Sequence, residues 1–228
     1  MKKYPLALYV LSALLPTGAW ASSAPQTANY GDFYVGAGVG IVVPQSTNIS
    51  ASGVINGSGT VSYKDSAAIL GMAGYHFNDY LAGEGELGYT SFDYGNVTGS
   101  LGGLSGSLAV NGHVDALVGL ANAIVTPLGR KEAWVPYVGG GLGFANTNSS
   151  ISAVGNTTFS SAVTNDETNL ALDAIVGVDF PVASGFSLGA RYQYLWVDSS
   201  STSSGSGETA SEGNFGVSII TAQATYQF

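Results

Sequence analysis

The chain has 228 residues, a formal net charge of −9 and no cysteine. Charged residues make up only 9% of it, against about 25% in an ordinary soluble domain, while 33 residues are glycine and 13 are tyrosine. The lack of cysteine excludes a disulfide framework, a thiolate metal site and a cysteine nucleophile. The acidic balance argues against nucleic acid as a partner, because its phosphates would be repelled.

The N-terminus has the three parts of an export signal. Lys2 and Lys3 precede an apolar run from Leu6 to Leu15, and Ala19-Trp20-Ala21 forms a small-residue cleavage site. The apolar run is too short for a membrane-spanning helix, which needs about 20 apolar residues. The pattern predicts a signal peptide over residues 1–21, a periplasmic tail over 22–30 and one domain over 31–228.

From Phe33 onward, apolar residues recur at every second position, which is the period of a β-strand with two different faces. In the first such segment Phe33, Val35 and Ala37 share one face, and Gly36 and Gly38 share the other. The alternation predicts eight strands, at residues 33–43, 66–77, 81–92, 108–125, 134–144, 169–180, 186–197 and 214–228.

The connections between these segments alternate in length. The short ones are 78–80, 126–133 and 181–185, and the long ones, rich in Ser, Gly, Asn and Thr, are 44–65, 93–107, 145–168 and 198–213. An even number of alternating strands, with short turns at one end and long loops at the other, is typical of a transmembrane β-barrel. We therefore predict an all-β fold, an eight-stranded antiparallel transmembrane β-barrel.

A soluble barrel or β-sandwich has the same period, so the direction of the apolar face decides between them. Charged and amide residues lie in strand centres and predict a network in the bore, formed by Glu84, Glu86, His113, Asp115, Asp173, Arg191 and Gln193. Aromatic residues lie on the apolar face near strand ends and predict two membrane-interface belts. Their members are Phe33, Phe77, Trp134, Phe180, Phe186, Tyr226 and Phe228 at one rim, and Tyr89, Phe144, Tyr194 and Trp196 at the other.

Glycine occupies alternate positions in two related stretches, FYVGAGVG at 33–40 and PYVGGGLG at 136–143. A phosphate-binding loop would need a helix after the glycines, and neither stretch is followed by a helical period. An eight-stranded barrel has an interior just wide enough for side chains. We therefore interpret these glycines as the inner wall of two strands, where they leave room for larger residues opposite.

Glu84 and Glu86 project two carboxylates to one face, a pair that could perform acid–base chemistry in a cleft. A charge-assisted network with Arg191 is the preferred interpretation. The inward candidates Glu84, Glu86, Asp115, Asp173 and Asp179 outnumber Arg191, His76 and His113. Because an unpaired carboxylate is costly in a dry interior, this surplus keeps open a hydrated bore and a narrow, cation-preferring porin.

An integral-membrane hydrolase or acyltransferase is the enzyme alternative, since His113 and Asp115 share a strand and serine is abundant. The sequence has no G-x-S-x-G motif and no metal-ligand spacing of histidines. We expect no catalytic residue, no metal and no cofactor, and therefore no enzyme activity.

Five segments resemble one family: FYVGAGVG, ELGYTSFDY (Glu86–Tyr94), VPYVGGGLGFA (Val135–Ala145), FSLGARYQYLWV (Phe186–Val197) and the terminal ATYQF. They are similar to the opacity-type, OmpA-like outer-membrane barrels, including the surface-antigen branch, over nearly the whole mature chain. The resemblance implies the outer membrane of a Gram-negative bacterium, contact with lipid and lipopolysaccharide, and recognition of Phe228 by the barrel-assembly machinery.

The leading hypothesis is a non-enzymatic surface protein, a surface antigen or adhesin, whose four outer loops contact an extracellular or host ligand. The narrow porin is the alternative. The surface protein and the porin have the same fold, so the two hypotheses differ in whether the bore is closed or open to ions.

Overall fold

A computed structural model describes residues 33–52, 57–101, 104–154, 157–198, 203–204, 208–212 and 215–228. The predicted signal peptide and N-terminal tail lie outside the described residues. The described part of the chain consists of β-strands and turns, and no helix in it is long and apolar enough to cross a membrane.

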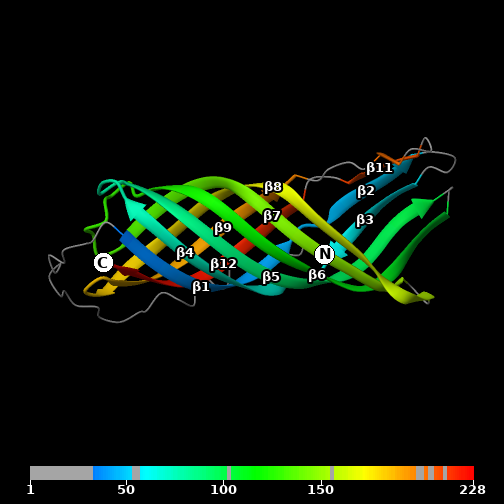
Figure 1. Cartoon of the computed structure of the whole chain (residues 1–228), viewed down its shortest axis with the longest axis horizontal. Helices are drawn as coiled ribbons and strands as arrows, with labels where there is room; N and C mark the ends of the chain where they lie inside the picture. The colour runs from blue at the N-terminus through cyan, green and yellow to red at the C-terminus, as the bar shows by residue number, and fades with distance from the viewer. Residues whose placement is uncertain are drawn as a thin grey trace, which may run out of the picture.

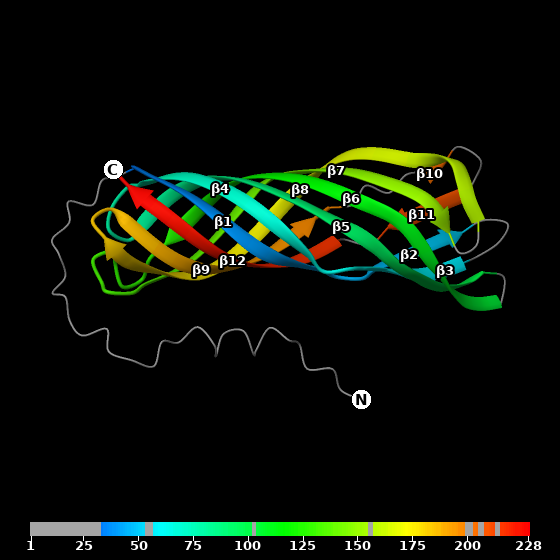
Figure 2. The same ribbon diagram turned by 90° about the horizontal axis from the view of Figure 1, so that it is seen from below.

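The described residues form strands in a simple chain order. The strands are β1 (Phe33–Pro44), β2 (Thr47–Ser52), β3 (Gly57–Tyr63), β4 (Ser66–His76), β5 (Leu81–Leu101), β6 (Leu104–Val125), β7 (Val135–Val154), β8 (Thr157–Ala183), β9 (Phe186–Val197), β10 (Ser203–Ser204), β11 (Glu208–Glu212) and β12 (Phe215–Gln227). They wind around one long axis, with the C-terminus at one end and β2, β3 and β11 at the other (Figures 1 and 2).

Eight of these strands close into a ring. The order is β5-β4-β1-β12-β9-β8-β7-β6, and β6 pairs back onto β5. Every neighbouring pair in the ring is antiparallel. Closure leaves the ring without an unpaired edge, so each strand has a partner on both sides. The prediction of an eight-stranded antiparallel barrel is confirmed.

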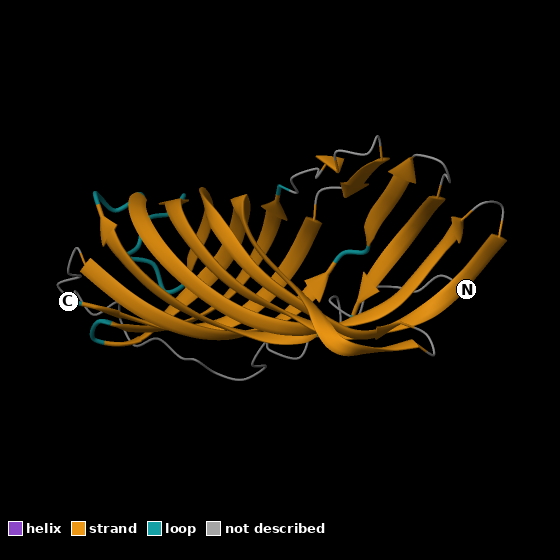
Figure 3. Ribbon diagram, turned by 45° about the vertical axis from the view of Figure 1, so that its right-hand side comes forward, coloured by secondary structure: helices purple, strands orange, loops and turns teal. Residues whose placement is uncertain are grey.

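The short connections gather at one end of the barrel, which we call the turn end; the C-terminus lies there too (Figure 3). At this end Asn78 accepts hydrogen bonds from the backbone N–H groups of Tyr80 at 2.8 Å and Leu81 at 2.9 Å. Asp79 pairs with Lys131 at 2.8 Å and Arg130 at 3.2 Å, and these hydrogen bonds hold the pKa of its carboxyl below the usual range. The turn before β5 is thereby fastened to the turn after β6.

The structure corrects the prediction of four long loops at the other end. Much of the predicted loops 44–65, 93–107, 145–168 and 198–213 is strand, and pairing in the β5–β6 hairpin continues to Leu101 opposite Leu104. We call this part the extension; it comprises β2, β3, β10, β11 and the outer ends of β5 to β8. A hairpin needs only paired backbone groups, so it continues where the alternation of apolar residues ends.

Apart from Gly140, which lies on the outer face of β7, the glycines of β1 and β7 line the bore, and neighbouring groups occupy the space that side chains would need. A Cβ atom on Gly36 would lie 2.8 Å from Thr225, and one on Gly40 would lie 2.8 Å from the Thr221 hydroxyl. A Cβ atom on Gly143 would collide with the carbonyl oxygen of Gly119. The interpretation of the glycine repeats as inner walls is confirmed, and it holds because the strands approach closely there.

The bore is filled in three layers. Near the turn end, one apolar cluster consists of Tyr34, Ala82, Ile124, Tyr137 and Ile175. Towards the extension, a second apolar cluster consists of Val42, Ala68, Leu120, Ala145, Ala171, Leu195, Val197 and Val217. Between them lie buried charged and amide side chains, among them Arg191, Glu84 and Gln193. The barrel therefore has a packed interior whose middle layer is polar.

The glycine wall leads to a paired prediction. Gly143→Ala should lower the free energy of unfolding by about 1–3 kcal/mol, because its methyl group meets a backbone oxygen that cannot move aside. Gly71→Ala is the matched control: Gly71 is exposed on the outer face, and a Cβ atom there has no neighbour within 4 Å. Urea unfolding in detergent micelles, followed by tryptophan fluorescence, measures both, and equal stabilities would contradict the packing described.

Candidate functional site

The buried polar side chains come from opposite walls of the barrel. Glu84 and Glu86 are two residues apart on β5 and therefore point to the same face. Arg191 and Gln193 have the same relation on β9, which lies four strands from β5 in either direction around the ring. Side chains from these two strands can meet only by crossing the bore.

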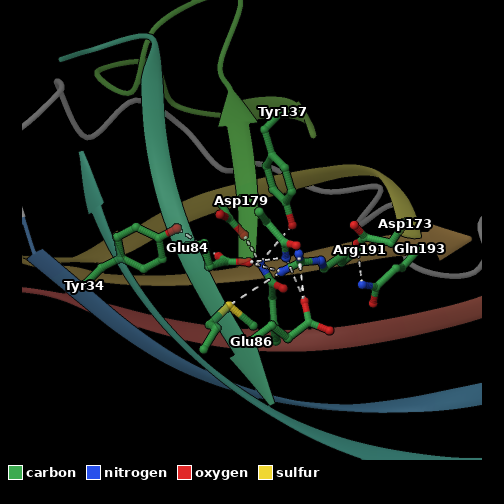
Figure 4. Close-up of polar contacts among 11 residues, drawn as sticks. Tyr34, Glu84, Glu86, Tyr137, Asp173, Asp179, Arg191 and Gln193 are labelled. Carbon is green, nitrogen blue, oxygen red and sulfur yellow. Dashed lines mark hydrogen bonds and ion pairs between the residues drawn. The ribbon is translucent and has the colours of Figure 1, made fainter. Parts of the chain in front are cut away.

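Arg191 makes that crossing. Its Nη1 atom lies 2.8 Å from Glu84 Oε1, and its Nη2 atom lies 3.0 Å from Glu86 Oε2. The Arg191 side chain is 1% exposed and each glutamate side chain 4%. Figure 4 shows the guanidinium between the two carboxylates. The sulfur of Met72 lies 3.8 Å from Nη1. One arginine thus ties the two walls together, by a charge-assisted hydrogen bond to Glu84 and an ion pair to Glu86.

Neutral donors complete the coordination of the glutamates. The Tyr34 hydroxyl donates to Glu84 Oε2 at 2.8 Å. Asn122, which pairs with Glu84 across the β5–β6 ladder, donates through Nδ2 to Glu84 at 3.4 Å and to Glu86 at 3.3 Å. These contacts lower the cost of burying two carboxylates next to a single cation.

Two further groups flank this centre. Gln193 Nε2 donates to Asp173 Oδ2 at 2.6 Å on the side of the extension. Towards the turn end, Gln223 Nε2 donates to Asp179 Oδ1 and to the Tyr137 hydroxyl, both at 2.9 Å. The network therefore extends along the bore from Asp173 to Asp179.

The expected network members divide between the two faces of the sheet. Glu84, Glu86, Asp173, Arg191 and Gln193 are buried in the bore.

The placement of His113 and Asp115 in the bore is wrong. They lie on the outer face of β6, where Asp115 accepts a hydrogen bond from Tyr89 at 2.9 Å and lies 3.7 Å from His113 Nε2. Near the extension the inner face of β6 carries Val114 and Ala116, both buried. The polar residues of this segment therefore face outward.

Four members of the network were not predicted from the sequence: Tyr34, Asn122, Tyr137 and Gln223. Tyr34 lies two residues before Gly36 on the same face of β1, and Gln223 lies two residues after Thr221 on the inner face of β12. Asn122 becomes recognisable only through its register opposite Glu84. The missing signal was therefore the pairing between strands, which alternation within one strand does not contain.

Small cavities remain on each side of Arg191. One, of about 50 Å³, opens at the turn end and is lined by residues that include Tyr34, His76, Tyr137 and Asp179. The other, of about 30 Å³, lies towards the extension beside Glu86, Gln193 and Leu120. Each has room for only a few water molecules. In the described part of the chain, no three His, Cys, Asp or Glu side chains are grouped to hold a metal ion.

The predicted interface aromatics all lie on the outer surface or at its rims. Most of them are well exposed, from Phe186 at 37% to Phe228 at 65%, and Tyr194 is partly covered. Several contact one another, for example Tyr194 and Trp196 with ring centroids 4.4 Å apart. Between the two groups the outer surface carries exposed Val, Ile and Leu side chains. Such a band is stable only against hydrocarbon.

Comparison with known proteins agrees with this geometry. Residues 11–228 match the model of the outer membrane protein β-barrel domain. The chain belongs to this family. A comparison with curated proteins found no match.

Three solved structures are among those similar to the chain. OprG of Pseudomonas aeruginosa is similar with a TM-score of 0.54 and 16% identity, over 87% of this chain and 97% of that one. Neisserial surface protein A has a TM-score of 0.49 and 18% identity, over 86% and 97%. Ail of Yersinia pestis has a TM-score of 0.45 and 16% identity, over 86% and 99%. At this identity the likeness to OprG shows a shared fold.

Family membership places this barrel in the outer membrane of a Gram-negative envelope. Barrels of this class have short turns on the periplasmic side and longer segments outside the cell. The turn end therefore faces the periplasm and the extension projects outward. The exposed aliphatic band contacts lipid, and the closed ring satisfies the backbone groups within it.

The crossing arginine leads to a prediction about stability. Arg191→Met should lower the free energy of unfolding by about 3–5 kcal/mol, because it leaves Glu84 and Glu86 buried without a cation. Adding Glu84→Gln and Glu86→Gln should restore most of this loss, since no uncompensated charge then remains between the walls. Urea unfolding in micelles measures both variants, and an Arg191→Met barrel as stable as wild type would refute the role given to the pair.

Proposed function

We propose that this outer membrane barrel is a non-conducting, non-enzymatic surface protein that presents its extension as a binding surface. The observation that carries the proposal is the closed bore: Arg191 crosses it, and an apolar layer lies above the arginine. A barrel whose interior is occupied in this way acts through its outer end. A surface-antigen or adhesin role follows from that position.

Two barriers in series support the non-conducting state. The ion pairs from Arg191 to Glu84 and Glu86 block the middle of the bore with side chains that are almost fully buried. Above them, Leu120, Leu195 and Val217 belong to an apolar cluster that offers a hydrated cation no ligands. An ion would have to break the first barrier and lose its water at the second. Because of these two barriers, the surplus carboxylates in the bore are better explained by a structural network than by a path for cations.

The extension supports an outward role. In it β3 pairs with β5, and β2 and β11 continue the sheet. Paired strands hold the backbone of a segment in a fixed position, which reduces the entropy lost when a partner binds. Function on a rigid scaffold is commonly carried by such exposed segments.

The geometry also favours a non-enzymatic role. Glu84 and Glu86, the candidate acid–base pair, share one arginine between two walls, so neither faces a substrate cleft. His113 and Asp115, the candidate partners of a serine, lie on the outer face beside Tyr89.

Further partners follow from the ends of the barrel. The outward Tyr89, Phe144 and Trp196 suit the level of lipid and lipopolysaccharide on the outer side. Phe228 is 65% exposed, and its backbone N–H donates to Phe33 at 2.9 Å, which closes the ring at its last residue. An accessible terminal aromatic suits recognition by the barrel-assembly machinery.

Conductance in planar bilayers tests the closed bore. Wild-type protein should produce no regular current steps. The variant Arg191→Ser/Leu120→Ser/Leu195→Ser removes both barriers and should produce regular current steps. These steps would show that a barrel prepared in the same way inserts into the bilayer. Regular steps from wild type, with cation selectivity lost in Glu84→Gln/Glu86→Gln, would favour the porin instead.

Shortened hairpins test the surface role. Replacing both Thr98–Ser107 and Ser152–Ala162 by Asn-Gly joins paired positions through two-residue turns and leaves the ring unchanged. Bacteria displaying this variant should lose most of the adhesion to host cells or matrix that wild type confers. Gly71→Ala, a substitution on the outer wall, is the control and should adhere normally. Full adhesion by the shortened barrel would place binding elsewhere.

A further inference from the structure

Two carboxylates of the network, Asp173 and Asp179, bond to an amide and have no ion pair among the described residues; Asp173 is the one nearer the extension. Arg191 directs its two terminal nitrogens to Glu84 and Glu86, so its single positive charge already faces two negative ones. Asp173 is 7% exposed, and its hydrogen-bond partners, the amide of Gln193 and the backbone of Gly141, are both neutral. A buried carboxylate bonded only to neutral groups is costly, so a further positive charge beside it would be favourable.

Two buried oxygens without a donor meet at Gly141. Asn122 Oδ1 and Asp173 Oδ1 have no hydrogen-bond partner among the described residues, and their side chains are 5% and 7% exposed. A Cβ atom on Gly141 would collide with the first oxygen and lie 2.8 Å from the second. The oxygens therefore point to one side of the same glycine, where they repel each other unless something positive lies between them.

A third free oxygen lies beside the same carboxylate. Gln193 is 1% exposed, and its Nε2 atom donates to Asp173 Oδ2 at 2.6 Å, while its Oε1 atom has no partner in the described part of the chain. Figure 4 shows Asp173 and Gln193 together on the side of Arg191 that is away from Glu84. The arginine is thus directed away from this group of oxygens.

We propose that Asn122, Asp173 and Gln193 form a buried site for one small monovalent cation, such as Na⁺. Carboxylate and amide oxygens are the ligands that hard cations prefer. One carboxylate matches one positive charge, whereas Ca²⁺ takes six to eight oxygens and Mg²⁺ requires near-octahedral coordination. The cation neutralises Asp173, separates the two oxygens at Gly141 and adds a second positive centre to the layer. This site is independent of the proposed surface role.

The first test compares salts on the folded protein in detergent micelles. At equal ionic strength, thermal unfolding in NaCl should occur roughly 3 °C or more above that in choline chloride, because choline is too large for the bore. Equal ionic strength keeps the screening of exposed charges the same. Equilibrium dialysis with ²²Na⁺ should find about one ion bound per folded chain.

Two variants locate the site. Asp173→Asn should abolish both the salt difference and the bound ²²Na⁺. Asp179→Asn is the control and should retain both, since Asp179 is also inside the bore and also accepts from an amide, but lies about 20 Å further along β8.

The opposite results overturn the proposal. Identical unfolding of wild type in the two salts, with no retained ²²Na⁺, would mean that only water occupies the position. A salt difference that survives Asp173→Asn, or that Asp179→Asn removes equally, would exclude this site. If Asp173→Asn fails to fold, the wild-type measurements still decide whether a cation binds.

Discussion

The hydrocarbon of a membrane offers no hydrogen bonds, so every backbone amide and carbonyl inside it needs a partner within the protein. A closed β-sheet meets this requirement, and in this barrel β5 and β6 complete the ring. Closure has a second consequence, because it separates an outer face against lipid from an inner face that must be filled. The alternation of residue types along each strand follows from these two surroundings.

Filling the inner face with polar residues brings an electrostatic cost that Arg191 offsets. Its two ion pairs run between walls that lie opposite each other in the ring, so they hold the barrel across its width as well as neutralising charge. The apolar clusters on either side leave room for only a few water molecules near these bonds, and the low dielectric strengthens them. A bore built in this way is stiff and closed, which leaves the extension as the part free to meet other molecules.

Much of this architecture could be predicted because the lipid environment imposes a period of two. Glu84, Glu86 and Arg191 stand on polar faces in strand centres, where alternation is strong, and their inward direction follows. The same rule failed for His113 and Asp115, because near the extension the inner wall is apolar and the outer wall has left the lipid. In this part of the barrel, the polar residues therefore lie on the outer face of the sheet.

The extension and the complete network depend on pairing between strands. Outside lipid, backbone groups can pair between strands that have no apolar face. The strands β2 and β3, which are rich in Ser, Thr and Gly, therefore carry no hydrophobic signal in the sequence. Asn122 joins Glu84 only through the register of β5 against β6, and Tyr137 meets Gln223 across the bore. Such relations between distant residues exist only in the closed barrel.

Site-directed spin labelling along β12 tests the arrangement of faces most directly, and the absence of cysteine makes single labels simple to introduce. Labels from residue 219 to 225 in lipid bilayers should show high accessibility to oxygen at Ile220, Ala222 and Ala224. The intervening positions, among them Thr221 and Gln223, should be protected. A profile without a period of two, or one with Thr221 and Gln223 facing the lipid, would contradict the account.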